Sequence, residues 1–241
     1  MANEVILRVA LAAHDARCHL DHIVAVAIAV GVGRGEDRAQ LEQAVRQACE
    51  AQRWEAAATR ALEGYSPEIS SFLYARLRSP TDADDVYSMF AEDLWTGLPT
   101  FGWRCSLRTW AYTLARNAIN RYKGAANNRA ERNLTLSKPG RLSALIERER
   151  SRTRQYQRTA VKDRFRALRQ QFDADDQTLL ILRVDRDMAW GDIAIAMSGD
   201  AELAEEQVTR EAVRLRKTFE RLKTELRRAA EREGLLEPET E

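Results

Sequence analysis

The sequence predicts an all-α fold, and its composition and its hydrophobic periodicity are the observations that predict it. Charged residues make up 31% of the 241-residue chain, which contains only 11 Gly and 5 Pro. Such a balance favours helices, which accept charged side chains on their outer faces but few Gly or Pro in their interiors. No strand-like alternation of apolar and polar residues continues for a useful length. We therefore expect two helical domains joined by a basic linker, preceded by a helical extension.

The positive charge is concentrated in the middle of the chain. Although the net charge is only +1, residues 121–170 hold 15 basic and 4 acidic side chains and lie between two mildly acidic segments. A local excess of this kind is typical of a segment that binds a polyanion. A solvated basic helix or a disordered linker would show the same pattern, so charge alone leaves these interpretations open.

Changes in periodicity divide the chain into segments. Turn signals at Ser66-Pro67, Ser79-Pro80 and Pro99-Thr100 separate several helical patterns in the first half. The segment 127–160 lacks a sustained apolar face, and helical patterns resume after it. We predict an N-terminal helical extension with a candidate regulatory role at 1–52, a first helical domain at 53–126, a basic linker at 127–160, a second helical domain at 161–235 and a tail at 236–241.

The extension contains the longest apolar run of the chain, at residues 23–32. This run is about half as long as a bilayer crossing requires, so we expect a buried or partner-facing helix and no membrane insertion. Residues 1–11 lack the basic start of a signal peptide. The three cysteines are scattered and form no CxxC pair, which fits a reducing cytoplasm.

All three histidines also lie in the extension, beside a cysteine: His14, Cys18, His19 and His22. Imidazole and thiolate groups suit Zn²⁺, but three ligands spread over two helical turns strain a tetrahedral site. The sequence therefore predicts no metal site and no cofactor, with these four residues as a weak candidate cluster. We expect ordinary helix positions instead, in an extension that packs on the first domain or on a partner.

An acidic amphipathic helix begins near residue 82. Thr81 and Asp82 are candidates to cap it, and acidic residues fill its first turn. Val86, Phe90 and Leu94 share one face, which leaves the acidic side chains outward. An outward acidic face suits a basic protein partner, although simple solvation would explain it as well.

The next stretch, residues 98–124, interleaves aromatic and basic side chains. Aromatic rings stack on unpaired bases, worth roughly 1–3 kcal/mol per base, while Arg and Lys hold phosphates. Asn117 and Asn120 add amides that can read a base edge. Trp110, Leu114 and Ala118 share helical spacing, so we expect Trp110 to be largely buried. The stretch as a whole is typical of a surface that binds nucleic acid.

Residues 172–228 have the order of a helix-turn-helix unit. Asp173 is placed to cap a first helix with a leucine face, a polar turn follows at residues 185–187, and a short helix carries Trp190 and Ile193. A break at Ser198-Gly199 precedes a long basic helix, whose N-terminal part would enter the major groove of DNA. Spacing alone does not distinguish this unit from other helical bundles.

Several motifs at fixed distances make the interpretation more specific. Asp85-Val86 and Leu94-Trp95 lie on the acidic helix, Phe101-Gly102 follows it, and the string SLRTWAYTLARN runs from Ser106 to Asn117. Together these motifs resemble region 2 of the extracytoplasmic-function (group IV) sigma factors of the sigma-70 family, and residues 172–217 resemble region 4. The resemblance implies a sigma factor that binds core RNA polymerase and directs promoter recognition, −10 melting and transcription initiation.

The resemblance also implies partners and roles for matching positions. The partners are core polymerase (the β′ clamp helices and the β flap), promoter DNA, and an anti-sigma factor or other regulator. Polymerase contacts fall to Asp84, Asp85, Ser88, Met89, Glu92 and Asp93, where Ser88-Met89 replaces the family's Gln-Glu. The −10 element falls to Arg108, Trp110, Tyr112, Arg116, Asn117, Asn120, Arg121, Tyr122 and Lys123. The −35 element falls to Gln207, Thr209, Arg210, Arg214, Arg216 and Lys217, although the preceding turn is longer than usual and Glu211 replaces a basic residue.

Two other classes of function explain less of the sequence. A stand-alone helix-turn-helix repressor or activator explains residues 172–228 but leaves the acidic helix and the SLRTW…ARN string without a role. An enzyme is not indicated, because all histidines lie in one stretch and no glycine-rich phosphate loop occurs. The sequence therefore predicts a cytoplasmic, non-enzymatic transcription factor.

Overall fold

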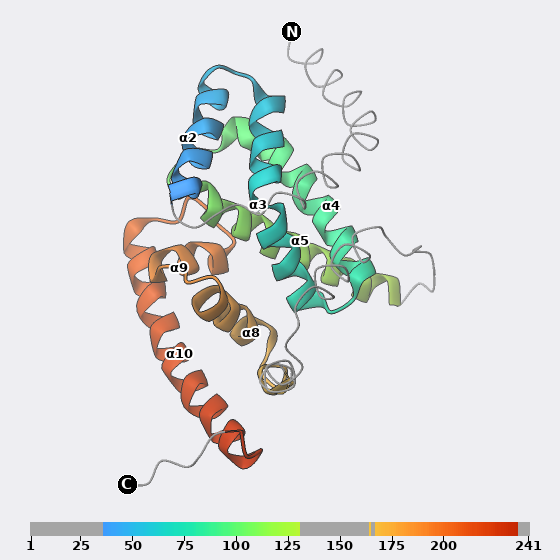
Figure 1. Cartoon of the computed structure of the whole chain (residues 1–241), viewed down its shortest axis with the longest axis vertical. Coiled ribbons are helices and arrows are strands. Elements are labelled where there is room, and N and C mark those ends of the chain that lie inside the picture. Colours follow the sequence, from blue (N-terminus) through green and yellow to red (C-terminus); the bar gives the residue numbers. More distant parts are fainter. Residues whose placement is uncertain (1–35, 131–163, 165–166, 236–241) are drawn as a thin grey trace.

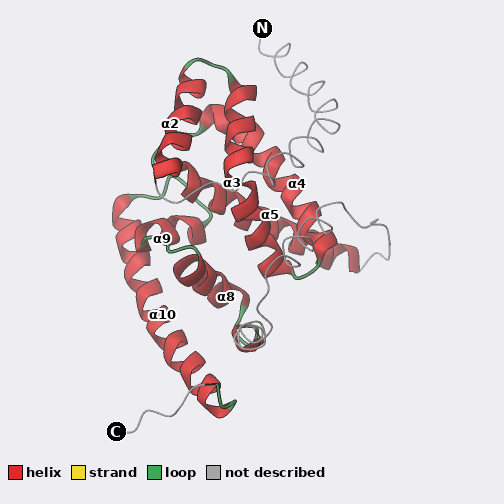
Figure 2. Cartoon of the chain, in the orientation of Figure 1, coloured by secondary structure: helices red, strands yellow, loops and turns green. Residues whose placement is uncertain are grey.

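A computed structural model confirms the all-α fold. It describes residues 36–130, 164 and 167–235. Helices joined by short loops and turns make up these residues, and no strand occurs among them (Figure 2). The predicted histidine–cysteine cluster, most of the basic linker and the tail lie outside the described residues. Within the described ranges, no helix is both long and apolar enough to cross a membrane.

The first group of helices packs around one long helix, α3 (Trp54–Leu77), which contacts the other three helices of the group. The group also contains α2 (Glu36–Glu50), α4 (Pro80–Gly97), the short 3₁₀ turn η1 (Leu98–Thr100) and α5 (Leu107–Ala130). α3 buries Ile69 and Phe72, and α4 buries Phe90 against them. α5 contributes small side chains such as Ala111 and Ala115, both fully buried, which let its backbone approach its neighbours closely.

α2 is an integral part of this core. Val45 and Ala48 are fully buried, and the carboxylate of Glu42 accepts hydrogen bonds from the Tyr65 hydroxyl (3.1 Å) and from the backbone N–H of Arg108 (3.2 Å). The sequence assigned this helix to the extension at 1–52. The division of the chain into domains stays a prediction, but α2 packs as one unit with α3.

Two local predictions in this group were wrong. α4 is capped by Ser79, whose hydroxyl accepts a hydrogen bond from the backbone N–H of Asp82, and not by Thr81 or Asp82. Pro80 explains the shift, because its fixed φ and missing N–H suit the first position of a helix. Pro67 is not at a turn but inside α3, where buried neighbours on both sides hold the helix together and override the propensity of proline to end it.

The second group follows in the order helix, turn, short helix and long helix. It consists of α8 (Ala174–Leu180), the π-helical turn η2 (Ile181–Asp185), α9 (Trp190–Ser198) and α10 (Glu205–Arg232). Asp173 caps α8 as predicted, accepting from the backbone N–H of Asp176 at 2.8 Å. Gly199 ends α9 with φ of 79°, a left-handed conformation that favours glycine.

The two groups lie against each other (Figure 1), and most of their buried side chains form one continuous cluster. α9 packs on α5, so the helix with the SLRTW…ARN string faces the second group of helices. This packing determines which of the predicted site residues are open to solvent.

Candidate nucleic-acid and polymerase interface

Trp110 is a structural residue near the start of α5. Its side chain is 7% exposed, which confirms the expected burial. The indole stacks on Phe101, with ring centroids 4.4 Å apart and an interplanar angle of 14°. A Cβ at Gly97 would lie 3.0 Å from the indole, so a glycine here lets α4 end against the ring. The Trp110–Phe101 pair thus fixes the loop between α4 and α5.

The carboxylate of Glu68 on α3 binds two of the predicted −10 residues. It pairs with the guanidinium of Arg108 and accepts a hydrogen bond from the hydroxyl of Tyr112 at 2.8 Å. Tyr112 is 1% exposed and packs edge-on against Phe72. Burial acts to raise the pKa of Glu68, but the hydrogen bond and charge of Arg108, with Tyr112 and Arg38, outweigh it and lower that pKa. In this arrangement the ring of Tyr112 serves the core and is not free to stack on a base.

The middle of α5 is covered by the second group of helices. The side-chain amide of Asn117 donates a hydrogen bond to the carbonyl of Gly199 at 2.9 Å. Arg116 forms an ion pair with Asp175 of α8 at 3.0 Å. Both predicted −10 residues therefore contact protein partners in the second group of helices.

The last turns of α5 extend beyond this contact. Asn120 and Lys123 are exposed. Arg121 forms an ion pair with Asp93 of α4, and the hydroxyl of Tyr122 donates to Asp82 at 2.7 Å. The structure thus brings the predicted −10 residues of α5 together with the acidic helix at one end of the first group.

α4 presents the residues predicted to contact the polymerase. Ser88 and Glu92 are exposed, while Asp84, Asp85, Met89 and Asp93 are half-buried. Both carboxylate oxygens of Asp84 are covered and have no hydrogen-bond partner among the described residues. Burial, and then the charge of Asp85, raise the pKa of Asp84 to about 6. A buried carboxylate without a partner is costly, and a cation brought by another molecule would offset that cost.

The first four turns of α10 carry the residues predicted to read the −35 element. Gln207 caps the helix start by accepting from the backbone N–H of Ala204 at 3.3 Å. Arg214 pairs with Glu211 on the same helix, which keeps part of its charge from a DNA phosphate. The guanidinium of Arg216 lies over the ring of Trp190, 5.6 Å from its centroid. All six predicted residues are exposed: Gln207, Thr209, Arg210, Arg214, Arg216 and Lys217.

Sequence reasoning missed the contacts that hold the two groups together. The hydroxyl of Thr109 on α5 donates to Asp192 of α9 at 2.8 Å, and Arg108 donates to the carbonyl of Arg186 at 2.9 Å. Arg76 of α3 is 9% exposed and donates to Gln177 at 3.2 Å. No periodicity marks these positions, because each contact joins residues more than 75 positions apart in the chain.

The stretch from α3 to the end of α5 is the part of the chain that is similar to a known protein family. Residues 61–129 match the family model of sigma-70 region 2. This match supports the interpretation that the chain is a member of the sigma-70 family. No curated protein matches the chain significantly. Within the region 2 segment lie all residues predicted to contact core polymerase and all those predicted for the −10 element. Region 2 in this family serves RNA polymerase binding and promoter recognition, which the match supports as the role of this chain.

In the part of the chain that the structure describes, no group of His, Cys, Asp or Glu side chains is arranged to hold a metal ion. Cys49 and Cys105 are both free thiols there. Burial raises the pKa of each thiol, to about 11 for Cys105, so neither is a reactive thiolate at neutral pH.

Proposed function

We propose that the chain is a sigma factor of the extracytoplasmic-function type, which acts in the cytoplasm without enzymatic activity of its own. It binds core RNA polymerase, recognises the −35 and −10 promoter elements and melts the −10 element. The observation that carries the proposal is the region 2 match at residues 61–129, which joins the acidic helix α4 to the aromatic and basic helix α5. The helix-turn-helix order of α8, α9 and α10 supports a second DNA-binding unit.

Polymerase binding falls to the acidic face of α4. Its exposed Glu92 and the unpartnered carboxylate of Asp84 would meet basic side chains of the β′ clamp helices. The second helical group would bind the β flap. The carboxylate of Asp84 has no cation beside it among the described residues. A basic partner would therefore gain more binding free energy there than at a carboxylate that is already paired.

Promoter contacts fall to α5 and α10. Asn120 and Lys123 are exposed, whereas Asn117 and Arg116 are engaged by Gly199 and Asp175. For Asn117 to read a base, the helix-turn-helix unit must move away from α5. The free chain therefore represents a closed form, and binding to polymerase would favour an open one. An anti-sigma factor or similar regulator would act on this equilibrium or on the face of α4.

Run-off transcription with purified core polymerase on a library of promoter fragments tests the proposal. We expect polymerase-dependent initiation at a defined sequence, lost when Asn117 or Asn120 is replaced by Ala. Arg60→Ala serves as the control, because Arg60 is an exposed α3 residue outside every predicted contact. Absence of initiation together with tight duplex binding by the protein alone would indicate a repressor or activator instead.

A charge reversal on α4 tests the polymerase contact separately. Glu92→Lys places a cation on the face predicted to meet basic side chains, so we expect loss of co-purification with core polymerase. Glu55→Lys makes the same change at an exposed position of α3 and serves as the matched control. Equal binding by both variants would remove α4 from the interface.

A further inference from the structure

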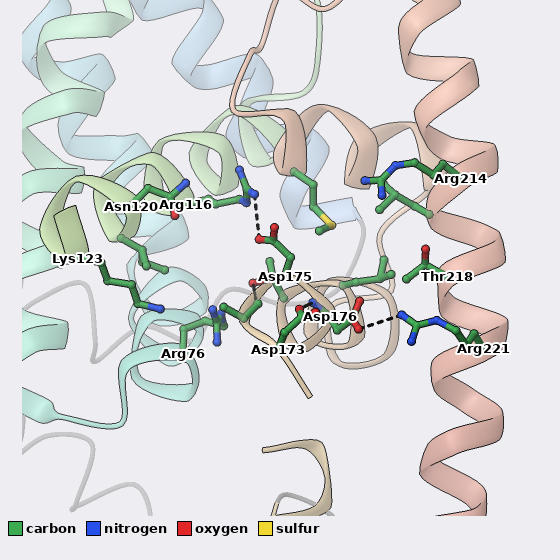
Figure 3. Close-up of a pocket in the computed structure, with 16 residues that line it drawn as sticks. Arg76, Arg116, Asn120, Lys123, Asp173, Asp175, Asp176, Arg214, Thr218 and Arg221 are labelled. Atoms are coloured by element: carbon green, nitrogen blue, oxygen red, sulfur yellow. Dashed lines mark hydrogen bonds and ion pairs between the residues drawn. The ribbon is translucent and has the colours of Figure 1, made fainter. Parts of the chain in front are cut away.

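A cavity of about 630 Å³ lies between the two groups of helices (Figure 3). Helices α3 and α5 form one wall, with Arg76, Arg116, Asn120 and Lys123 facing the cavity. This wall carries three cations and no carboxylate. The size is within the range of small-molecule sites in proteins.

The opposite wall comes from α10 and from α8 with the residue that caps it. The carboxylates on this side are already engaged: Asp173 caps α8, Asp175 pairs with Arg116, and Asp176 pairs with Arg221 at 3.1 Å. Arg221 and Arg214 add two further cations from α10. The lining holds five cations and three carboxylates, but Arg214 and Arg221 also pair with Glu211 and Glu225, which stand outside the lining. The positive charge in excess therefore falls on the wall formed by α3 and α5.

The excess charge is concentrated at the wall formed by α3 and α5. Arg76 is 9% exposed, and its Nε has no hydrogen-bond partner among the described residues. Burial, and then the neighbouring Arg78 and Arg116, lower the pKa of Arg76 against the pull of Asp175. Burial, and then the charge of Arg76, lower the pKa of Lys123 in the same way. Like charges held together at a partly buried wall destabilise one another, and an anion between them would reverse that effect.

We propose that this cavity binds a small molecule through a phosphate or diphosphate group, held by Arg76, Arg116 and Lys123 with the amide of Asn120. Guanidinium groups offer paired donors that match phosphate oxygens, and a Lys adds a point charge. The other wall of the cavity includes Thr218 and Arg221 of α10, so a ligand that fills the cavity contacts both groups of helices and stabilises their packing against each other. If the chain acts as the proposed sigma factor, this ligand holds Asn117 against Gly199 and opposes promoter binding.

Isothermal titration of the full chain with inorganic pyrophosphate at constant ionic strength tests the site. We expect saturable binding at one site per chain, weakened about tenfold by Lys123→Ala, which is the loss that one charged hydrogen bond would cause. Lys123 is exposed, so its replacement leaves the fold intact. Arg60→Ala removes an exposed cation outside the cavity and should leave the affinity unchanged.

A parallel titration with a short single-stranded oligonucleotide distinguishes the two sources of phosphate, a small molecule and the backbone of DNA. Pyrophosphate binding that depends on Lys123 supports the proposal. Absence of pyrophosphate binding, or equal binding by Lys123→Ala, overturns it. Binding of the oligonucleotide alone, lost in Lys123→Ala, also overturns it and assigns the cations to the DNA surface. No polymerase is present in these titrations, so their failure leaves the proposed function untouched.

Discussion

The side-chain amide of Asn117 and the backbone of Gly199 interlock where the two groups of helices meet. The amide donates to the Gly199 carbonyl at 2.9 Å, and a Cβ on Gly199 would lie 2.7 Å from Oδ1 of Asn117. Gly199 is therefore required twice, by its φ of 79° and by the close approach of Asn117. A residue predicted to hold a promoter base thus also joins the two groups of helices.

Gly199→Ala is expected to loosen the closed form. The left-handed backbone alone costs an alanine about 1–2 kcal/mol, and the clash with Asn117 adds to it. For a chain of this size each kcal/mol lowers the melting temperature by roughly 2–4 °C, which differential scanning calorimetry resolves.

Gly234→Ala is the matched control for this prediction. Gly234 also has a positive φ, of 66°, but nothing lies within 4 Å of its Cβ position. It therefore carries the backbone cost without the clash. Adding Asn117→Ala is expected to restore part of the stability of Gly199→Ala and none of that of Gly234→Ala. Equal melting temperatures for the two glycine variants would contradict the interlock.

Glu68→Gln is expected to destabilise the first group of helices by about 2–4 kcal/mol at neutral pH, because it leaves the half-buried Arg108 without its counter-charge. The pKa of Glu68 is lowered in the folded protein, so its contribution is complete above the unfolded value, about 4.3, and is lost as the pH falls through the folded value. The difference between wild type and variant should therefore shrink below about pH 4.

Urea unfolding at pH 7 and at about pH 3 measures this difference. Glu55→Gln, at an exposed position of the same helix, is the control and should change stability little at either pH. A difference between wild type and Glu68→Gln that stays constant with pH would show that Glu68 acts through packing and not through its charge.

The fold was largely predictable because local rules agree with tertiary packing in most helices. Asp173 at the start of α8 and Gly199 at the end of α9 act where helix-capping chemistry places them. Pro67 was not predictable from local rules, because burial of its neighbours outweighs its preference to end a helix. Ser79 was missed since Pro80 moves the helix start toward the N-terminus.

The candidate site was predictable only in its residue types. The clustering of aromatic and basic residues on α5 shows in the sequence, but the burial of Tyr112 by Glu68 and Phe72 depends on packing between distant segments. The cover over Asn117 depends in the same way on how the second group docks. Periodicity assigns a residue to a face of its own helix and carries no information about which other helix meets that face.

Asp84→Asn is expected to stabilise the free protein at neutral pH. Burial and the charge of Asp85 raise the pKa of Asp84 from 3.8 to about 6, so the folded state disfavours the charged form of this carboxyl group. The resulting destabilisation is absent below pH 3.8, grows between pH 3.8 and 6, and is complete above pH 6. Thermal unfolding at pH 4 and pH 7.5 should show a gain for Asp84→Asn only at the higher pH. Glu92→Gln, an exposed change on the same helix, should show no such gain.

Replacing single cations on α10 is expected to separate phosphate contacts from base contacts. Lys217→Ala should weaken binding of the polymerase complex to all promoters alike and lower the slope of log affinity against log salt by about 0.9, the effect of one lost phosphate contact. Arg210→Ala should instead change the preference among −35 sequences, by roughly 1–3 kcal/mol at one base pair. Lys223→Ala is the control, because Lys223 pairs with Glu220 further along the helix at 2.8 Å. An unchanged salt slope for Lys217→Ala would remove this part of α10 from the DNA surface, since a cation that neutralises a phosphate must release counterions.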